Sequence, residues 1–240
     1  MSYLRPRGFT LLEMMVTLGI LAVLMVISIN GLSLMRPRAD LSTSVADISR
    51  ALTNARQLAL AHGSSVWFGF IPPGDQGVGY YIVYESWDGS FDPATSASLA
   101  TVADGDDLTK TKRAALHNEA ADEEQCADAR CHRDHVRSIE ALPPSIEPAA
   151  GSVFGDDDHL PVSFRYENLS SLDSGCSFCT SEGPGWLEFL PRGEVRFPAA
   201  PDDPNAVLVL SVRDEIDQAR RAHLISITAP YGLVRRFAND

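Results

Sequence analysis

The hydrophobic pattern of this chain is continuous at its start and periodic afterwards. From Met14 to Ile29 there is no charged residue, and only a few small residues interrupt the aliphatic and methionine side chains. A bilayer core about 30 Å thick requires about 20 mostly apolar residues in a helix, and Phe9–Ile29 has that length. The pattern therefore predicts a transmembrane helix within residues 9–35.

A helical period follows the apolar segment, within residues 36–63. Apolar residues recur there at spacings of four and three, which is typical of an amphipathic helix packed on a sheet. These residues are Leu41, Val45, Ile48, Leu52, Ala55 and Ala59. Pro37 lacks a backbone donor and predicts a kink or a local unwinding near Arg36. Gly63 is a natural residue to end the helix.

From Ser65 onward the pattern becomes strand-like, with short runs of β-branched and aromatic residues separated by Gly, Pro and Asp. The predicted strands are Ser65–Ile71, Gly79–Trp87, Val136–Ile139, Val162–Tyr166, Trp186–Leu190, Glu194–Phe197, Ala206–Val212, His223–Thr228 and Leu233–Phe237. The first two form one predicted hairpin, and Pro191–Gly193 turns a second. One helix followed by many antiparallel strands indicates an α+β fold, with a β-rich head over residues 64–240. Residues 88–134 lose this periodicity and read as an acidic, solvated insert with a short helix near Leu116–Cys126.

A short basic and polar leader, residues 1–8, precedes the apolar segment. Arg5 and Arg7 lie in it, and no basic residue follows until Arg36. Because basic residues favour the cytoplasmic side of a membrane span, we expect a single-pass protein with a cytoplasmic N-terminus. An ordinary secretory signal is cut after its apolar segment. A cut after Gly8 would instead leave the anchor on the mature protein.

Glu13 does not fit an ordinary membrane anchor. A carboxylate within an apolar helix is unfavourable without a partner, so it indicates a functional role. The free amine of a neighbouring copy would be a simple partner, and cleavage between Gly8 and Phe9 would create that amine. The sequence therefore predicts that Glu13 acts in assembly. The alternative is a plain signal anchor in which this glutamate has no role.

The stretch Gly8-Phe9-Thr10-Leu11-Leu12-Glu13, with the apolar run behind it, resembles the N-termini of type IV prepilins. The resemblance implies a prepilin peptidase that cuts between Gly8 and Phe9, and N-methylation of Phe9. It also implies that Glu13 pairs with the amine of a neighbouring subunit during filament assembly.

Three later pieces resemble the pseudopilin family of type II secretion protein H and FimT. They are Ala55–Ala59 followed by the Val66–Phe68 strand, the hairpin segment Phe189–Gly193, and the closing unit Leu224–Val234. The resemblance covers most of the chain except residues 88–134. It implies a long N-terminal helix packed on a β-rich head, in agreement with the pattern described above.

The resemblance implies a minor pseudopilin of a type II secretion system, a structural subunit of the periplasmic filament that drives protein secretion. Such a protein is anchored in the bacterial inner membrane with its head in the periplasm. Its partners are other pilin or pseudopilin subunits, the prepilin peptidase and the inner-membrane assembly platform. The alternative is a FimT-like minor type IV pilin that acts in pilus assembly or DNA uptake.

Some members of the FimT branch bind DNA through a basic C-terminal tail, and Arg235 and Arg236 are the candidates here. The arginine that usually follows the glycine is absent after Gly232. The net charge of −12 also opposes a general affinity for nucleic acid or anionic lipid. Two arginines at this place are more typical of a solvated strand edge.

Four cysteines in an oxidising compartment indicate two disulfides. Cys126 and Cys131 could pair locally, as could Cys176 and Cys179, while cross-pairing between the two clusters stays open. His132 and His135 could complete a zinc site with the first pair, and a haem attachment is a more distant alternative. An anchored metal or haem protein is therefore a third interpretation, although we expect neither metal nor cofactor.

The remaining polar clusters match no catalytic pattern. The runs Asp104–Asp107 and Asp156–His159 are rich in carboxylates, but neither has the spacing of an EF-hand calcium loop. They read as solvated acidic loops, with weak calcium binding as the alternative. The sequence contains no phosphate-binding loop, activated serine or metalloprotease motif. We therefore expect a protein that is not an enzyme.

Overall fold

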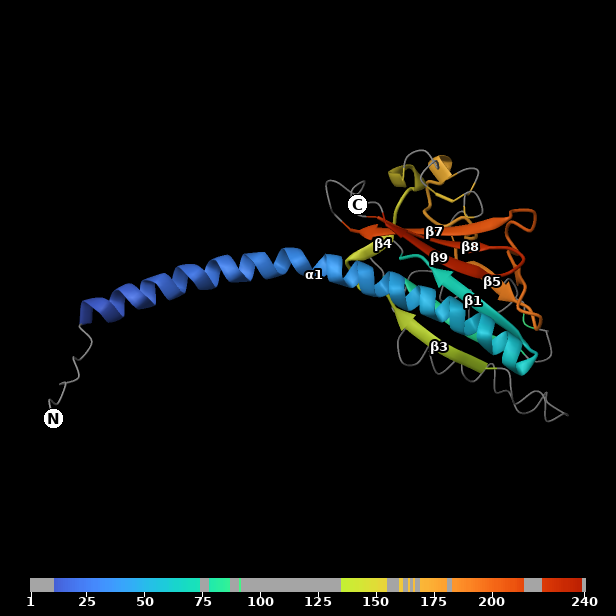
Figure 1. Ribbon diagram of the computed structural model, residues 1–240, viewed down its shortest axis with the longest axis horizontal. Helices are drawn as coiled ribbons and strands as arrows, with labels where there is room; N and C mark the ends of the chain where they lie inside the picture. Colours follow the sequence, from blue (N-terminus) through green and yellow to red (C-terminus); the bar gives the residue numbers. More distant parts are fainter. Residues whose placement is uncertain are drawn as a thin grey trace, which may run out of the picture. The chain divides into compact units, whose positions relative to one another are not determined.

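The computed structural model describes residues 11–73, 78–86, 91, 135–154, 160, 161, 164, 166, 169–180, 183–213 and 222–238, without the side chains of residues 26–36, 135 and 136. The chain divides into two compact units, Met1–Ala39 and Asp40–Asp240. We call them the N-terminal unit and the head. The architecture is α+β with antiparallel sheets, as predicted (Figure 1).

A single long helix, α1, runs from Leu11 to His62 and therefore belongs to both units. It is continuous through Pro37, so the predicted local unwinding is wrong, while the alternative of a kink at Pro37 stays a prediction. A proline removes one intrahelical hydrogen bond, and the turns on either side of Pro37 retain enough bonds to keep the segment helical. The predicted end is confirmed, because Gly63 has a φ of 67° and its N–H donates to the carbonyl of Ala59 at 3.0 Å.

The first sheet of the head has five antiparallel strands in the order β3-β2-β1-β5-β6. Their bounds are β1 Ser65–Ile71, β2 Tyr80–Ser86, β3 His135–Ala141, β5 Gly185–Phe189 and β6 Val195–Arg196. The β1–β2 and β5–β6 pairs are the two predicted hairpins. The β1–β5 pair joins segments far apart in the sequence, with Phe68 opposite Leu187.

The second sheet has four antiparallel strands in the order β4-β7-β8-β9. Their bounds are β4 Ile146–Pro148, β7 Asn205–Val212, β8 His223–Thr228 and β9 Leu233–Ala238. Two short 3-10 helices, η3 Gly151–Phe154 and η6 Leu169–Ser171, pack with β7 and β8 in a separate apolar cluster. This cluster buries one face of the second sheet and leaves the other for the main core.

The main core lies between the head portion of α1 and both sheets (Figure 1). The apolar stripe predicted from the sequence is confirmed, since all six of its residues are at most 3% exposed. They pack against Phe68 of β1, Leu187 of β5, Leu208 of β7 and Ile225 of β8. Burial of each large side chain contributes about 1.5–3 kcal/mol, so this packing, more than helix propensity, holds α1 on the head.

Two sequence predictions in the head differ from the structure or cannot be compared with it. The strand predicted over Val162–Tyr166 is wrong at Phe164, which lies in a 3-10 turn where its N–H donates to the carbonyl of Pro161 at 2.8 Å. Pro161 favours such a turn because its φ is already fixed. The short helix predicted near Leu116–Cys126 lies outside the described residues.

Candidate functional site

The first described turns of α1 expose apolar side chains all around the helix. From Leu11 to Met25 every residue is exposed, and the large apolar side chains range from 52% exposed at Met14 to 79% at Leu11. A helix that is apolar on every face is typical of a segment buried by other helices or by lipid. This surface is therefore the first candidate for a contact with other molecules.

None of the helices in the described residues combines the length and the hydropathy needed to span a membrane.

Glu13 lies in the first turn of α1, exposed among these apolar residues. A carboxylate near a helix N-terminus interacts favourably with the helix dipole, so its position suits the helix itself. Thr17, one turn later, donates its hydroxyl to the carbonyl of Met14 at 3.0 Å, so its hydroxyl has a hydrogen-bond partner within the helix. Gly8 and Phe9 lie outside the described residues. The assembly role of Glu13, and cleavage and methylation at Phe9, therefore stay predictions.

The structure brings together the three pieces of the head that carry the pseudopilin resemblance. Arg56 of α1 donates its Nε–H to the carbonyl of Gly193, in the β5–β6 turn, at 3.2 Å. A Cβ on Gly232, in the β8–β9 turn, would lie 3.2 Å from both Arg56 and Phe189. Both glycines have positive φ, 78° and 59°, a region that side chains disfavour. Segments that are distant in the sequence thus form one joint at the end of α1.

Sequence reasoning missed a buried charge cluster around Glu85, near the end of β2. Glu85 is fully buried and accepts hydrogen bonds on both carboxylate oxygens. Ser64 Oγ lies 2.6 Å and His62 Nδ1 lies 2.7 Å from its Oε1, while Arg137 of β3 donates to its Oε2. A carboxylate only accepts, so the His62 Nδ1 must carry the proton in this contact. The cluster ties the end of α1 to two strands of the first sheet.

The pKa of Glu85 is set by two opposing effects. Burial by itself raises it, because desolvation disfavours the charged form. The hydrogen bonds from Ser64, His62 and Arg137, together with the positive charge of Arg137, outweigh burial and hold the pKa of Glu85 below its ordinary value. A glutamate inside an otherwise apolar strand was the one sequence signal that could have revealed the cluster.

Cys176 and Cys179 form a disulfide, as the local pairing predicted, with their Cα atoms 5.4 Å apart. The bond holds a tight segment whose ends bridge to both sheets, Cys176 to Leu208 of β7 and Cys179 to Gly185 of β5. Its role is therefore structural. Cys126, Cys131 and His132 lie outside the described residues, and His135 is the first residue of β3. The second disulfide and its zinc or haem alternatives stay predictions.

Replacement of both Cys176 and Cys179 by serine should lower the free energy of unfolding by about 2 kcal/mol, since the bond closes a very short loop. In a chain of this size that corresponds to a melting temperature lower by about 4–8 °C. Thermal unfolding of the full chain in detergent measures the shift. The Cys126→Ser/Cys131→Ser variant is the matched comparison, and thiol counting on each variant reports whether its remaining pair is oxidised. An unchanged melting temperature in the Cys176→Ser/Cys179→Ser variant would contradict the structural role.

Arg235 and Arg236 lie on β9, which is an edge strand of the second sheet, and both are exposed. Their backbones pair with Ser226 and Ile225 of β8. The guanidinium of Arg235 lies 5.8 Å from the centre of the Phe164 ring, a distance suited to a cation–π contact. Neighbours on a strand point to opposite faces, so the two arginines do not form one basic patch.

Comparison with known proteins adds one finding. Residues 4–29 match the family described as the prokaryotic N-terminal methylation motif. The match covers the predicted cleavage junction, Glu13 and the whole apolar run from Met14 to Ile29, and it supports a type IV pilin-like protein. No curated protein and no solved structure gives a significant match to the chain.

Proposed function

We propose that this protein is a minor pseudopilin of a type II secretion system, related to type II secretion protein H and FimT. It would be a structural, non-enzymatic subunit of a periplasmic filament, anchored in the bacterial inner membrane before assembly. The observation that carries the proposal is the N-terminal methylation motif over residues 4–29, which includes the helical stretch Leu11–Met25 with apolar side chains exposed on all faces.

The assembly step follows from the spacing of the motif. Cleavage after Gly8 would leave a free amine on Phe9, four residues before Glu13, which is about 6 Å along a helix. A neighbouring helix displaced by about one turn would bring its own amine level with this carboxylate. The ion pair would form only between correctly staggered subunits, while the apolar side chains of the two helices cover each other. The pair would therefore set the register of the filament.

The head supports a relation to the family of type II secretion protein H and FimT. The joint of Arg56, Gly193 and Gly232 is built from the same pieces that resemble type II secretion protein H and FimT. A long helix packed on antiparallel sheets also agrees with the fold that this resemblance implies. These features support the proposal without distinguishing the two branches of the family.

The mass of the mature N-terminus tests the proposal. We expect that co-expression with a prepilin peptidase yields a chain that begins at N-methylated Phe9. A Gly8→Leu variant should keep Met1, because the residue before the cut is changed while the apolar helix is not. An uncut wild-type chain, or a cut after the apolar run, would remove the protein from the pilin assembly pathway.

A second candidate function is that of a FimT-like minor pilin in DNA uptake, which the exposure of Arg235 and Arg236 favours. Phosphate contacts by these side chains would be weakened by salt. A mobility shift at low salt that is lost in an Arg235→Ala/Arg236→Ala variant would support this role. Arg192→Ala/Arg196→Ala, which also removes two exposed arginines, is the matched control. No binding by the wild-type chain at low salt would exclude it.

A further inference from the structure

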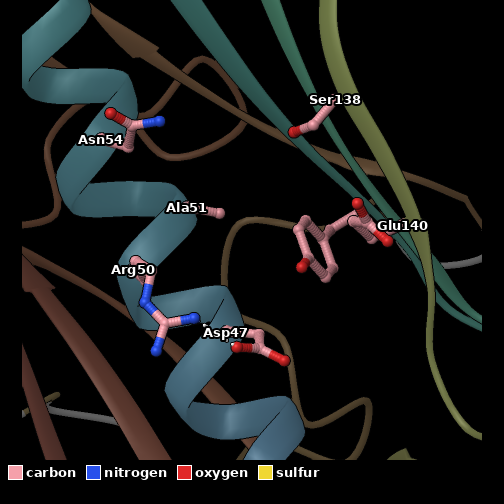
Figure 2. A pocket seen from close by; sticks show the side chains of 7 residues that line it. Asp47, Arg50, Ala51, Asn54, Ser138 and Glu140 are labelled. Carbon is pink, nitrogen blue, oxygen red and sulfur yellow. Dashed lines mark hydrogen bonds and ion pairs between the residues drawn. The ribbon is translucent and has the colours of Figure 1, made fainter.

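A polar groove of about 330 Å³ lies between α1 and the edge of the first sheet (Figure 2). Asp47, Arg50 and Asn54 line it from α1, spaced so that they share one face of the helix. Ser138 and Glu140 line it from β3. The groove is separate from the apolar stripe of α1, which faces the core.

The sheet register explains why the core ends at this groove. Tyr81 and Val83 of β2 belong to the main core, and their partners on β3 are Glu140 and Ser138. Directly opposed residues of an antiparallel pair point to the same face. The core-facing side of β3 is therefore polar, and the polar flank of α1 lies opposite it. One more strand beside β3 would place its own alternate side chains in this space.

The groove contains polar groups whose hydrogen-bonding capacity is not used within the described residues. Tyr81 is 7% exposed, and no described residue donates to or accepts from its hydroxyl. Burial first, and then the negative charges of Glu140 and Asp47, raise the pKa of Tyr81 to about 12, whereas Arg50 acts in the opposite direction. Tyr81 itself lines the groove together with Asp47 and Glu140.

The charges of the groove select a cation. Arg50 Nη1 lies 2.7 Å from Asp47 Oδ1, but its side chain is 76% exposed and points toward solvent. This pair neutralises one carboxylate, and Glu140 leaves the groove with a net negative charge. Tyr81, Ser138 and Asn54 add oxygen atoms that can accept hydrogen bonds. An ammonium or guanidinium group would satisfy these acceptors, whereas an anionic group would be repelled.

The edge of the sheet indicates which kind of segment could carry this cationic side chain into the groove. Among the described strands, β3 is the last on its side of the first sheet, so its outer backbone groups face away from the sheet. An extended segment can add to such an edge through main-chain hydrogen bonds, with alternate side chains entering neighbouring pockets. The chain carries a net charge of −12, which favours a basic partner over a second copy of itself.

We propose that the edge of β3 and the groove beside it bind an extended, basic segment of a partner protein, with a lysine or arginine side chain held between Glu140, Asp47 and Tyr81. The site would be separate from Leu11–Met25, the exposed apolar part of α1. It would let the head recognise a partner while α1 packs with other subunits. The inference does not depend on which secretion or pilus machine the protein serves.

A peptide binding experiment on the full chain in detergent tests this site. The probe is a short peptide of alternating lysine and threonine, and the comparison peptide has glutamate in place of lysine. We expect the lysine peptide to bind, with an affinity that falls as the salt concentration rises. The glutamate peptide should not bind. An Asp47→Asn/Glu140→Gln variant should bind the lysine peptide about tenfold more weakly. Equal binding of the two peptides, or unchanged binding by this variant, would overturn the proposal.

Two controls separate the parts of the site. Glu194→Gln makes the same kind of change at an exposed position in the β5–β6 turn, toward the other edge of the sheet, and should bind like the wild type. A lysine peptide methylated on alternate backbone nitrogens should bind poorly if it adds as a strand, and full binding would overturn strand addition. Self-association of the wild-type chain that the Glu140→Gln variant abolishes would identify a second copy as the occupant and also overturn the proposal.

Discussion

Replacement of Glu13 by alanine should leave cleavage after Gly8 intact but lower incorporation of the subunit into filaments by about tenfold or more. The cleavage junction is unchanged, and α1 keeps its exposed apolar surface. What is lost is the partner for the amine of the neighbouring Phe9, which would remain as an uncompensated charge in an apolar interface. The measurement is the ratio of the subunit in sheared filaments to that in membranes.

The control for this prediction lies one turn further along the helix. Thr17→Ala removes a polar group that is satisfied by the carbonyl of Met14 and should assemble normally. Glu13→Gln should fail like Glu13→Ala, because the loss of the charge, rather than of side-chain volume, removes the ion pair. Normal incorporation of either Glu13 variant would show that the glutamate has no role in assembly.

Replacement of Glu85 by glutamine should lower the free energy of unfolding of the head by about 3 kcal/mol. The substitution leaves Arg137 without its anionic partner and weakens the bonds from Ser64 and His62 to a fully buried side chain. In a domain of this size the melting temperature should fall by about 6–12 °C. Urea unfolding followed by tryptophan fluorescence reports this change, because Trp67 and Trp186 are both buried in the head.

The Glu85 contribution also has a defined pH dependence. Since the folded-state pKa is lowered, the stabilisation is fully present above the ordinary glutamate pKa of about 4.3. It is lost as the pH falls through that value toward the lower folded-state pKa. The difference in stability between wild type and Glu85→Gln should therefore be constant near neutral pH and shrink in acid.

Glu194→Gln is the matched substitution for this measurement as well, because Glu194 is exposed and an exposed change is usually within about 0.5 kcal/mol. A loss of stability that is equal for Glu85→Gln and Glu194→Gln would mean that the buried cluster contributes little. If the stability difference between wild type and Glu85→Gln increased in acid, the pH dependence expected from the lowered pKa of Glu85 would be wrong.

The sequence was most informative where structure follows from local periodicity. The stripe from Leu41 to Ala59 has the period of a helix, and its burial follows because those side chains share one face. The two hairpins were predictable for a related reason, since the two strands of each are consecutive in the sequence and such strands commonly pair. At Pro37 the predicted local unwinding did not occur, because one missing hydrogen bond does not unwind a long helix.

Candidate sites were predictable only where the signal lies within a few consecutive residues. Glu13 is a charged residue beside a long apolar run. Cys176 and Cys179 are close enough in sequence to form a disulfide within a turn. Arg235 and Arg236 were recognised as basic, but only the structure shows that Arg235 lies over Phe164 on an edge strand. The two arginines are neighbours in the sequence, but the sequence did not show that their side chains have different surroundings in the fold.

The sequence alone determined that this chain has a pilin-like N-terminus, a helix with one buried face and a β-rich head, because these features depend on the order and spacing of nearby residues. Only the tertiary structure decided that β1 pairs with β5, that Glu85 meets Arg137, and that Glu140 faces Asp47 across a groove. Each of these contacts joins segments distant along the chain. Their geometry depends on how the whole core packs, and no local pattern carries that information.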